Sequence, residues 1–161
     1  MSSVMPELKL LPVGAAYHVV IAGLHQLCFD DGWTAYTVGQ VMRMEGAFGY
    51  VAVVETADDE IPVGFALASG TLDEWELLSI AVLPQYRRTG AARRLMDAIL
   101  IGVRAHQGDK LFLEVAEDNA AARRLYESYG FTQVGRRPGY YKRPNGPAMT
   151  ALTMRRDLAP K

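Results

Sequence analysis

The clearest chemical feature of the sequence is a basic loop between an apolar run and the start of a helix. Residues 77–82 form the apolar run, and residues 83–92, LPQYRRTGAA, form the loop and the first helical turn. Free backbone N–H groups at a helix N-terminus point toward an anion, and the helix dipole favours its charge. Gly90 lets the backbone approach that anion closely. The loop therefore predicts a pyrophosphate site, although a turn with solvated arginines gives the same pattern.

Other residue types that carry chemistry give weaker patterns. Cys28 follows His25 by three residues, so the two share a helical face, and a thiol beside an imidazole is one arrangement that forms acyl-enzymes. No basic or polar context surrounds the thiol, so buried packing is the preferred interpretation. No group of His, Cys or carboxylate residues has metal-ligand spacing, and we expect no metal. The chain has neither a G-x-G-x-x-G nor a G-K-[ST] motif.

Length and composition indicate one globular domain. The chain has 161 residues, of which 50% are apolar and 22% charged, which excludes a disordered or fibrous chain. Its apolar runs are too short for a membrane span, and its N-terminus does not resemble a signal peptide. With Cys28 as the single cysteine, no internal disulfide forms. We expect a soluble cytoplasmic protein with one domain over residues 1–161 and flexible ends at 1–6 and 158–161.

Charge is distributed unevenly along the chain. Residues 1–80 contain two basic and eleven acidic residues, whereas residues 81–161 contain fifteen basic and seven acidic residues. A basic half suits an anionic ligand, and an acidic half could attract a cationic one. The two halves could equally interleave in the fold and give a mixed surface.

Apolar periodicity and turn residues divide the chain into seven strands and four helices. Thr34 is a candidate N-cap for the second helix, Asp118 or Asn119 for the fourth, and Gly130 stands where a C′ glycine belongs. The order βααβββαβαββ predicts a mixed α/β domain. The expected strands are 7–13, 50–55, 61–69, 76–82, 110–116, 131–141 and 148–156, and the expected helices are 15–29, 34–44, 90–106 and 119–129.

These elements carry motifs that resemble one enzyme family. The pattern Arg87-x-x-Gly90-x-Ala92 matches the acetyl-CoA loop [QR]-x-x-G-x-[GA] of the GNAT N-acetyltransferases. Residues 113–131, LEVAEDNAAARRLYESYGF, resemble the L-E-V-x-x-x-N-x-x-A-x-x-L-Y-x-x-x-G-F segment of the RimI-type ribosomal-protein-alanine N-acetyltransferases. The resemblance extends to Trp33-Thr34 and to Arg137 with Tyr140-Tyr141. It implies a GNAT-like central mixed, mostly antiparallel sheet.

The resemblance also implies two catalytic residues. Glu114 matches the family's general base, and Tyr126 its general acid. An α-amine with a pKa near 8 is partly deprotonated at neutral pH, so a carboxylate acting through water suffices as its base. Alternation along the strand places Glu114 opposite its apolar neighbours, as it would a solvent-facing glutamate. Tyr126 could instead pack in the core, and packing and catalysis can coexist.

Acetyl-CoA is the cofactor that the resemblance implies, with CoA as product. The backbone at Ile80, Ala81 and Val82 would pair with the pantetheine arm, and Asn119 and Tyr126 would also contact the cofactor. The acceptor amine would lie against Trp33, Tyr140 and Tyr141. The pyrophosphate would be held by Arg87, Arg88, Thr89, Gly90, Ala91 and Ala92.

Two departures from the family pattern fall where the acceptor would bind. RimI-type sequences carry an acidic E-D-A element before the last strand, whereas residues 146–151 contain no acid. The proline usual before the family's tryptophan is Gly32 here.

The leading hypothesis is therefore acetyl transfer to a protein N-terminus, such as that of a ribosomal protein. An alternative within the family is a small amine or a lysine side chain. A non-catalytic module could instead bind RNA through four arginine pairs, but the chain's pI near 6.3 argues against a nucleic-acid partner. We expect no membrane partner and a monomer. The arginine pairs are Arg87-Arg88, Arg93-Arg94, Arg123-Arg124 and Arg136-Arg137.

Overall fold

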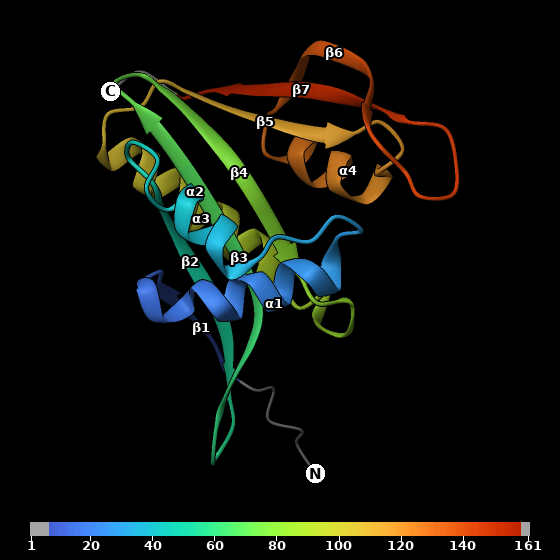
Figure 1. Ribbon diagram of the computed structural model, residues 1–161. Coiled ribbons are helices and arrows are strands. Elements are labelled where there is room, and N and C mark those ends of the chain that lie inside the picture. Colours follow the sequence, from blue (N-terminus) through green and yellow to red (C-terminus); the bar gives the residue numbers. More distant parts are fainter. Residues whose placement is uncertain (1–6, 159–161) are drawn as a thin grey trace. The chain divides into compact units, whose positions relative to one another are not determined.

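The computed structural model of the chain describes residues 7–158 (Figure 1). The predicted order βααβββαβαββ is confirmed. The strands are β1 (Glu7–Pro12), β2 (Phe48–Glu55), β3 (Glu60–Thr71), β4 (Glu74–Val82), β5 (Lys110–Ala116), β6 (Thr132–Tyr141) and β7 (Met149–Asp157). The helices are α1 (His18–Cys28), α2 (Ala35–Val41), α3 (Ala91–Ala105) and α4 (Ala120–Ser128), with 3₁₀ turns η1 (Ala15–Tyr17) and η2 (Pro84–Tyr86).

The expected flexible ends lie outside the described residues, apart from Leu158. Its side chain is only 7% exposed, and its N–H donates to the carbonyl of Asp109 at 2.7 Å. Residue 158 therefore continues the packed end of β7, because an apolar side chain and a backbone donor both find partners there.

Seven strands hydrogen-bond in the order β1-β2-β3-β4-β5-β7-β6. The pairs β1·β2, β2·β3, β5·β7 and β6·β7 are antiparallel, whereas β4 and β5 are parallel. A parallel pair needs a crossover, and α3 supplies it. The chain forms two compact units, the first made of residues up to Gly70 with Leu77–Gly102, and the second of Thr71–Glu76 with Val103 onward.

Helices cover both faces of the sheet in the first unit (Figure 1). Alternate β2 residues Val51 and Val53 pack with α1 and α2, as do Phe65 and Leu67 of β3. On the opposite face, the ring of Phe48 lies against Gly102 of α3. Thr34 caps α2 as predicted, because its hydroxyl accepts the N–H of Thr37 at 3.1 Å.

In the second unit, β5 alternates buried and partly exposed residues along its whole length. Helix α4 then begins at Asn119, whose Oδ1 accepts the N–H of Ala122 at 3.2 Å. It ends before Gly130, whose φ of +82° lies in the left-handed region that glycine favours. Both predicted caps are confirmed, so the local sequence defines this helix.

A bulge between β2 and β3 generates a stability prediction. The register shifts between Ala52 and Val53, and a Cβ on Gly64 would lie 2.6 Å from the carbonyl oxygen of Ala81. Gly64→Ala therefore forces backbone apart and should lower the free energy of unfolding by about 1–3 kcal/mol. Gly23→Ala in α1 is the control, because a Cβ there meets nothing within 4 Å.

The control substitution should raise stability by about 0.5–1 kcal/mol, since alanine favours a helix interior. Urea unfolding of both variants measures the difference. If Gly64→Ala and Gly23→Ala were equally stable, the backbones of β3 and β4 would not be in close contact at Gly64.

Candidate active site

Glu114 lies at the centre of a group of titratable residues in the second unit. Leu113 and Val115 are buried, so alternation turns Glu114 to the other face of β5, as predicted. Its side chain is 22% exposed, and its Oε1 lies 3.4 Å from Nη1 of Arg137 on β6. A partly shielded carboxylate beside a cation can accept a proton and return it to solvent.

Glu76 joins this group from β4 and was not identified from the sequence as a site residue. Parallel pairing sets Glu76 opposite Phe112, two residues before Glu114 on the same face of the sheet. Desolvation raises the pKa of Glu76, the Glu114 carboxylate raises it further, and Arg137 opposes both. The alternation in Glu74-Trp75-Glu76 was the available signal, but it does not reveal which strand lies alongside.

Tyr126 reaches the second unit's core from α4. Its side chain is 7% exposed, and its ring packs edge-on against Phe131 with centroids 5.9 Å apart. Burial, with a smaller contribution from Tyr141, raises the pKa of Tyr126 to about 12. The phenol therefore keeps its proton at neutral pH and has one to donate, so the packing and catalytic interpretations are compatible.

Two further tyrosines stand at the end of β6. Tyr140 and Tyr141 meet edge-on at 5.3 Å, and the guanidinium of Arg137 lies 5.3 Å from the ring centre of Tyr140. Burial raises the pKa of Tyr141 to about 12, followed by the charge of Glu114 and then Tyr140. Tyr141 thus couples electrostatically to Glu114 and also to Tyr126.

The predicted anion loop lies in the first unit, between η2 and α3. Arg88 and Gly90 have φ of +66° and +86°, and the hydroxyl of Thr89 donates to the carbonyl of Tyr86 at 2.6 Å. The backbone N–H of Arg94 donates to the carbonyl of Gly90, which forms the first hydrogen bond of α3. Left-handed residues at a helix start turn several N–H groups toward one point, which is a concavity for an anion.

Arg87 of the loop and Arg94 of α3 both donate to backbone carbonyls. Arg87 donates Nε to the carbonyl of Val82 at 3.2 Å, and Arg94 donates to the carbonyl of Leu8 on β1. Both side chains thus stabilise the protein scaffold. Arg88 is exposed, so the loop could offer an anion backbone N–H groups together with this guanidinium.

Cys28 and His25 do not form a nucleophilic pair. The Nδ1 of His25 accepts the backbone N–H of Trp33 at 2.9 Å, and the Cys28 thiol lies 3.8 Å from the carbonyl oxygen of Val82. Burial raises the pKa of the Cys28 thiol, although Arg87 opposes that shift. Both features agree with the packing interpretation drawn from the sequence.

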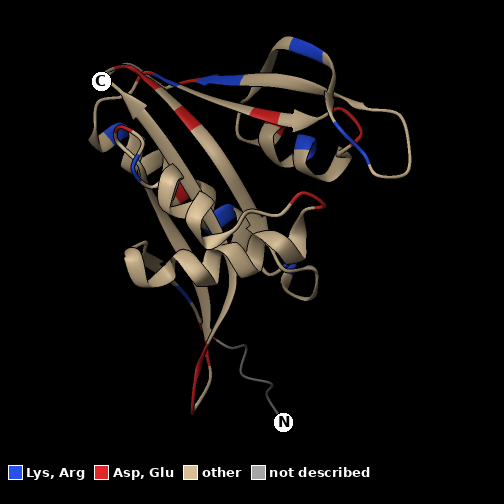
Figure 2. Cartoon of the chain, viewed as in Figure 1, with Lys and Arg blue, Asp and Glu red and all other residues tan. Residues whose placement is uncertain are grey.

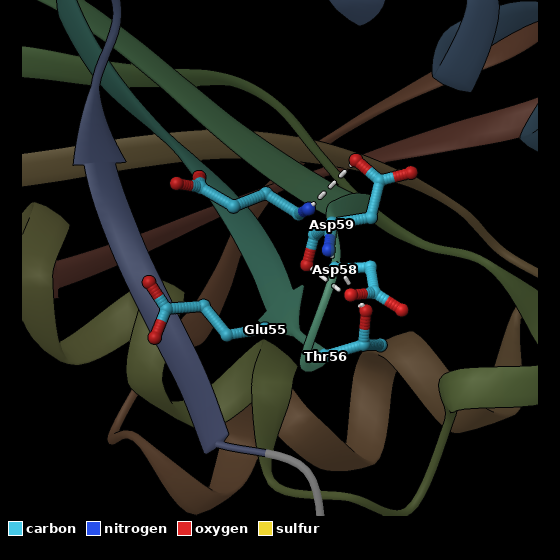
Figure 3. A pocket seen from close by; sticks show the side chains of 5 residues that line it. Glu55, Thr56, Asp58 and Asp59 are labelled. Carbon is cyan, nitrogen blue, oxygen red and sulfur yellow. Dashed lines mark hydrogen bonds between the residues drawn. The ribbon is translucent and has the colours of Figure 1, made fainter.

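An acidic hollow at the tip of the β2–β3 hairpin is separate from these residues (Figure 3). Thr56 and Asp59 form two hydrogen bonds with each other there. The N–H of Thr56 donates to the Asp59 carbonyl at 2.8 Å, and the Asp59 N–H donates to the Thr56 hydroxyl at 3.1 Å. This polar turn joins the strands expected at residues 50–55 and 61–69. Within residues 7–158, no group of His, Cys, Asp or Glu side chains is arranged to hold a metal.

Part of the basic charge of the second unit is paired with carboxylates of the same unit. Figure 2 shows acidic residues at the β2–β3 tip and basic residues on α4, β6 and β7. Four arginines of this unit form ion pairs with carboxylates: Arg136–Glu117 at 3.5 Å, Arg137–Glu114 at 3.4 Å, Arg143–Asp118 at 3.0 Å and Arg155–Asp157 at 2.9 Å. Among the described helices, none is long and apolar enough to cross a membrane.

Known proteins are similar to this chain in sequence and in fold. The model of the acetyltransferase (GNAT) family matches residues 20–131. A ribosomal protein bS18-alanine N-acetyltransferase of Haemophilus ducreyi is 34% identical over 119 residues, 74% of this chain and 81% of that protein. An N-alpha-acetyltransferase of Mycobacterium tuberculosis is 43% identical over 84 residues, 52% of this chain and 49% of that protein.

A crystal structure gives the same result for the fold. The ribosomal-protein-S18-alanine N-acetyltransferase from Escherichia coli superposes with a TM-score of 0.85 at 25% identity, covering 96% of each chain. The predicted mixed, mostly antiparallel sheet is thus confirmed. Since the family model matches well over half of its residues, the chain belongs to the acetyltransferase (GNAT) family.

Proposed function

We propose that this acetyl-CoA-dependent N-acetyltransferase acts on the α-amino group of a protein N-terminus, such as that of a ribosomal protein. The observation that carries the proposal is the group formed by Glu114, Tyr126 and Tyr141, a proton acceptor and two protonated phenols. The names of the relatives from Haemophilus ducreyi and Escherichia coli support the ribosomal substrate. Acetyl-CoA and new protein N-termini occur together in the cytoplasm, where we place the reaction.

Acetyl-CoA supplies a thioester whose carbonyl carbon forms a bond to the acceptor nitrogen as its bond to sulfur breaks. Glu114 would take the proton that the amine releases, through a water molecule. Tyr126 would hold a proton for the departing thiolate. Because the pKa of Tyr126 is about 12, this proton is present throughout the physiological range. Glu76 lies opposite Phe112, two residues before Glu114 along β5. It would keep a second carboxylate near the cationic amine.

The loop before α3 fits the pyrophosphate of the cofactor. A Cβ on Gly90 would point into open space, with nothing within 4 Å, so the anion could rest there against bare backbone. Arg88 would add charge, while Thr89, Ala91 and Ala92 would contribute N–H groups. Along β4, pairing with β5 ends at Glu76 among the described residues, and the backbone of Ile80–Val82 beyond it would hold the pantetheine arm, apart from the Val82 carbonyl that Arg87 already binds.

Four residues placed by resemblance have defined surroundings. Asn119 uses Oδ1 as the cap of α4, so a contact with the cofactor arm would come from its Nδ2. Tyr140 is 50% exposed and Tyr141 lies beside it, so an extended peptide could pass over this pair. Trp33, in the segment between α1 and α2, would contact the acceptor from the first unit.

Acceptor choice is tested with N-terminal hexapeptides varied at their first two positions, assayed by mass spectrometry. A lysine-containing peptide with a blocked N-terminus and a set of small amines serve as controls. Acetylation confined to free peptide N-termini is expected. Faster acetylation of the small amines or of lysine would overturn the choice of acceptor and leave the family assignment intact.

Gly90→Glu should abolish acetyl-CoA binding, because it places a carboxylate and a side chain where the pyrophosphate needs bare backbone. Thermal unfolding with and without acetyl-CoA measures this, since a ligand that binds the native state raises Tm. Gly14→Glu is the matched control, with open space around its Cβ and φ of −117°. Gly90→Ala separates backbone strain from charge. An undiminished Tm rise in Gly90→Glu contradicts the loop's role.

Glu114→Gln should keep acetyl-CoA affinity and lower kcat by about 10²–10⁴-fold. The loss should be largest at low pH, where more of the acceptor amine is protonated and needs a base. Glu127→Gln, on the exposed part of α4, is the control for loss of one carboxylate. A rate equal to that of the unmodified enzyme from pH 6 to 9 would make Glu114 an ordinary strand residue.

Tyr126→Phe removes the phenol proton and keeps the ring against Phe131, so kcat should fall by about 10²-fold or more at near-normal stability. Tyr126→Ala should in addition lose about 3–5 kcal/mol of packing. Because the pKa of Tyr126 is about 12, the rate of the unmodified enzyme should not fall from loss of this proton below about pH 10. A catalytically silent Tyr126→Phe would withdraw the acid role.

A further inference from the structure

The segment between α1 and α2 is fastened to the end of α1 through the backbone of a single residue, Trp33. Its N–H donates to Nδ1 of His25 at 2.9 Å, and its carbonyl accepts Nε2 of Gln26 at 2.8 Å. Both backbone groups of Trp33 are therefore bound by consecutive side chains of one helix. We call His25, Gln26 and Trp33 the backbone clamp.

Ring packing adds to the clamp. The imidazole of His25 stacks on the indole of Trp33, with centroids 4.3 Å apart and planes 10° from parallel. Phe29 and Phe65 pack around the same imidazole at 4.4 and 6.1 Å, and His25 is only 5% exposed. The position and tilt of the indole are thus set by a buried ring that the core holds in place.

Gly32 makes this arrangement possible. A Cβ at position 32 would lie 2.6 Å from Cγ and 2.7 Å from Cα of Gln26, which is too close for any side chain. The glycine that replaces the usual proline of the family pattern therefore lets the segment approach α1. One residue beyond Trp33, Thr34 caps α2, so the clamp also fixes where that helix begins.

The clamp requires a neutral imidazole. Nδ1 accepts a hydrogen bond, so the ring proton must be on Nε2, and a second proton on Nδ1 would set two donors against each other. Burial lowers the pKa of His25 to about 4, and the nearby carboxylate of Asp31 opposes that shift. The rings packed around the imidazole, Phe29, Trp33 and Phe65, carry no charge.

We propose that His25, acting with Gln26, is a positioning residue for the acceptor, because it fixes the backbone and ring of Trp33. This rests on the proposed function, in which Trp33 contacts the acceptor. His25 contacts Trp33 and does not contact the reacting atoms. Its loss should therefore raise the KM for the peptide and leave kcat and acetyl-CoA affinity unchanged. Breaking a hydrogen bond of this kind changes an equilibrium by about three- to tenfold.

Two variants at position 25 and a control at position 27 test the proposal. His25→Leu removes the acceptor for the Trp33 N–H, whereas the Oδ1 of Asn in His25→Asn reaches the region that Nδ1 occupies. We expect His25→Leu to raise the peptide KM about three- to tenfold, and His25→Asn to restore most of it. Leu27→Ala is the control on the same helix, since Leu27 is 71% exposed. Measurements are made well below the Tm of each variant.

Hydrogen exchange of the Trp33 amide in the free protein gives a readout that needs no substrate. Protection should be lost in His25→Leu and kept in His25→Asn and Leu27→Ala. Acidification adds a second such readout. The folded protein holds His25 neutral down to about pH 4, while the unfolded chain protonates it near 6.5, so stability falls as pH decreases from about 6.5 toward 4. His25→Asn should show a shallower fall between pH 7 and 5.

The outcomes separate this inference from the proposed function. An unmodified enzyme that acetylates no peptide N-terminus overturns the proposed function, whatever the state of the Trp33 amide. An active enzyme whose peptide KM is the same in His25→Leu overturns the positioning role. An equal loss in His25→Leu and His25→Asn, or a fall in kcat with unchanged KM, also overturns it, because neither follows from a lost acceptor for the Trp33 N–H.

Discussion

Parallel pairing of β4 with β5 is the constraint on which the group of titratable residues around Glu114 depends. It sets Glu76 opposite Phe112, so Glu76 and Glu114 share one face of the sheet. The antiparallel register of β5 with β7 then places Thr153 opposite Glu114, and β6 places Gly135 opposite Thr153. Arg137 follows Gly135 by two residues, which brings its guanidinium to the same face, within 3.4 Å of the Glu114 carboxylate.

The order of elements could be predicted from the sequence because it is a local property. Apolar periodicity defines α3, the caps at Asn119 and Gly130 define α4, and alternation defines β5. Register between strands is set by residues far apart in the chain, so Glu76 could not be assigned to the site. Glu114, Tyr126 and the tyrosine pair were identified through their family motifs, and the roles assigned to them there remain predictions.

Several side chains of the first unit form hydrogen bonds with backbone groups. Arg87 and Cys28 both reach the Val82 carbonyl at the end of β4, and His25 and Gln26 both reach Trp33. Side chains that bind main-chain groups leave a weak sequence signal, because many residue types can donate or accept. The spacing of His25 and Cys28 suggested a nucleophile, yet the ring nitrogen of His25 is occupied by a backbone donor eight residues later.

Burial has the largest effect on the pKa values of Glu76, Tyr126 and Tyr141, and the Glu114 carboxylate acts on two of them. After burial, the charge of Glu114 is the next influence that raises the pKa of both Glu76 and Tyr141. Tyr141 in turn adds to the effect of burial on Tyr126. An ionised Glu114 therefore favours protonated partners around itself, while Arg137 limits the effect at Glu76. The charge of Glu114 thus acts directly on Glu76 and Tyr141, whereas the proton of Tyr126 is held mainly by the burial of its own ring.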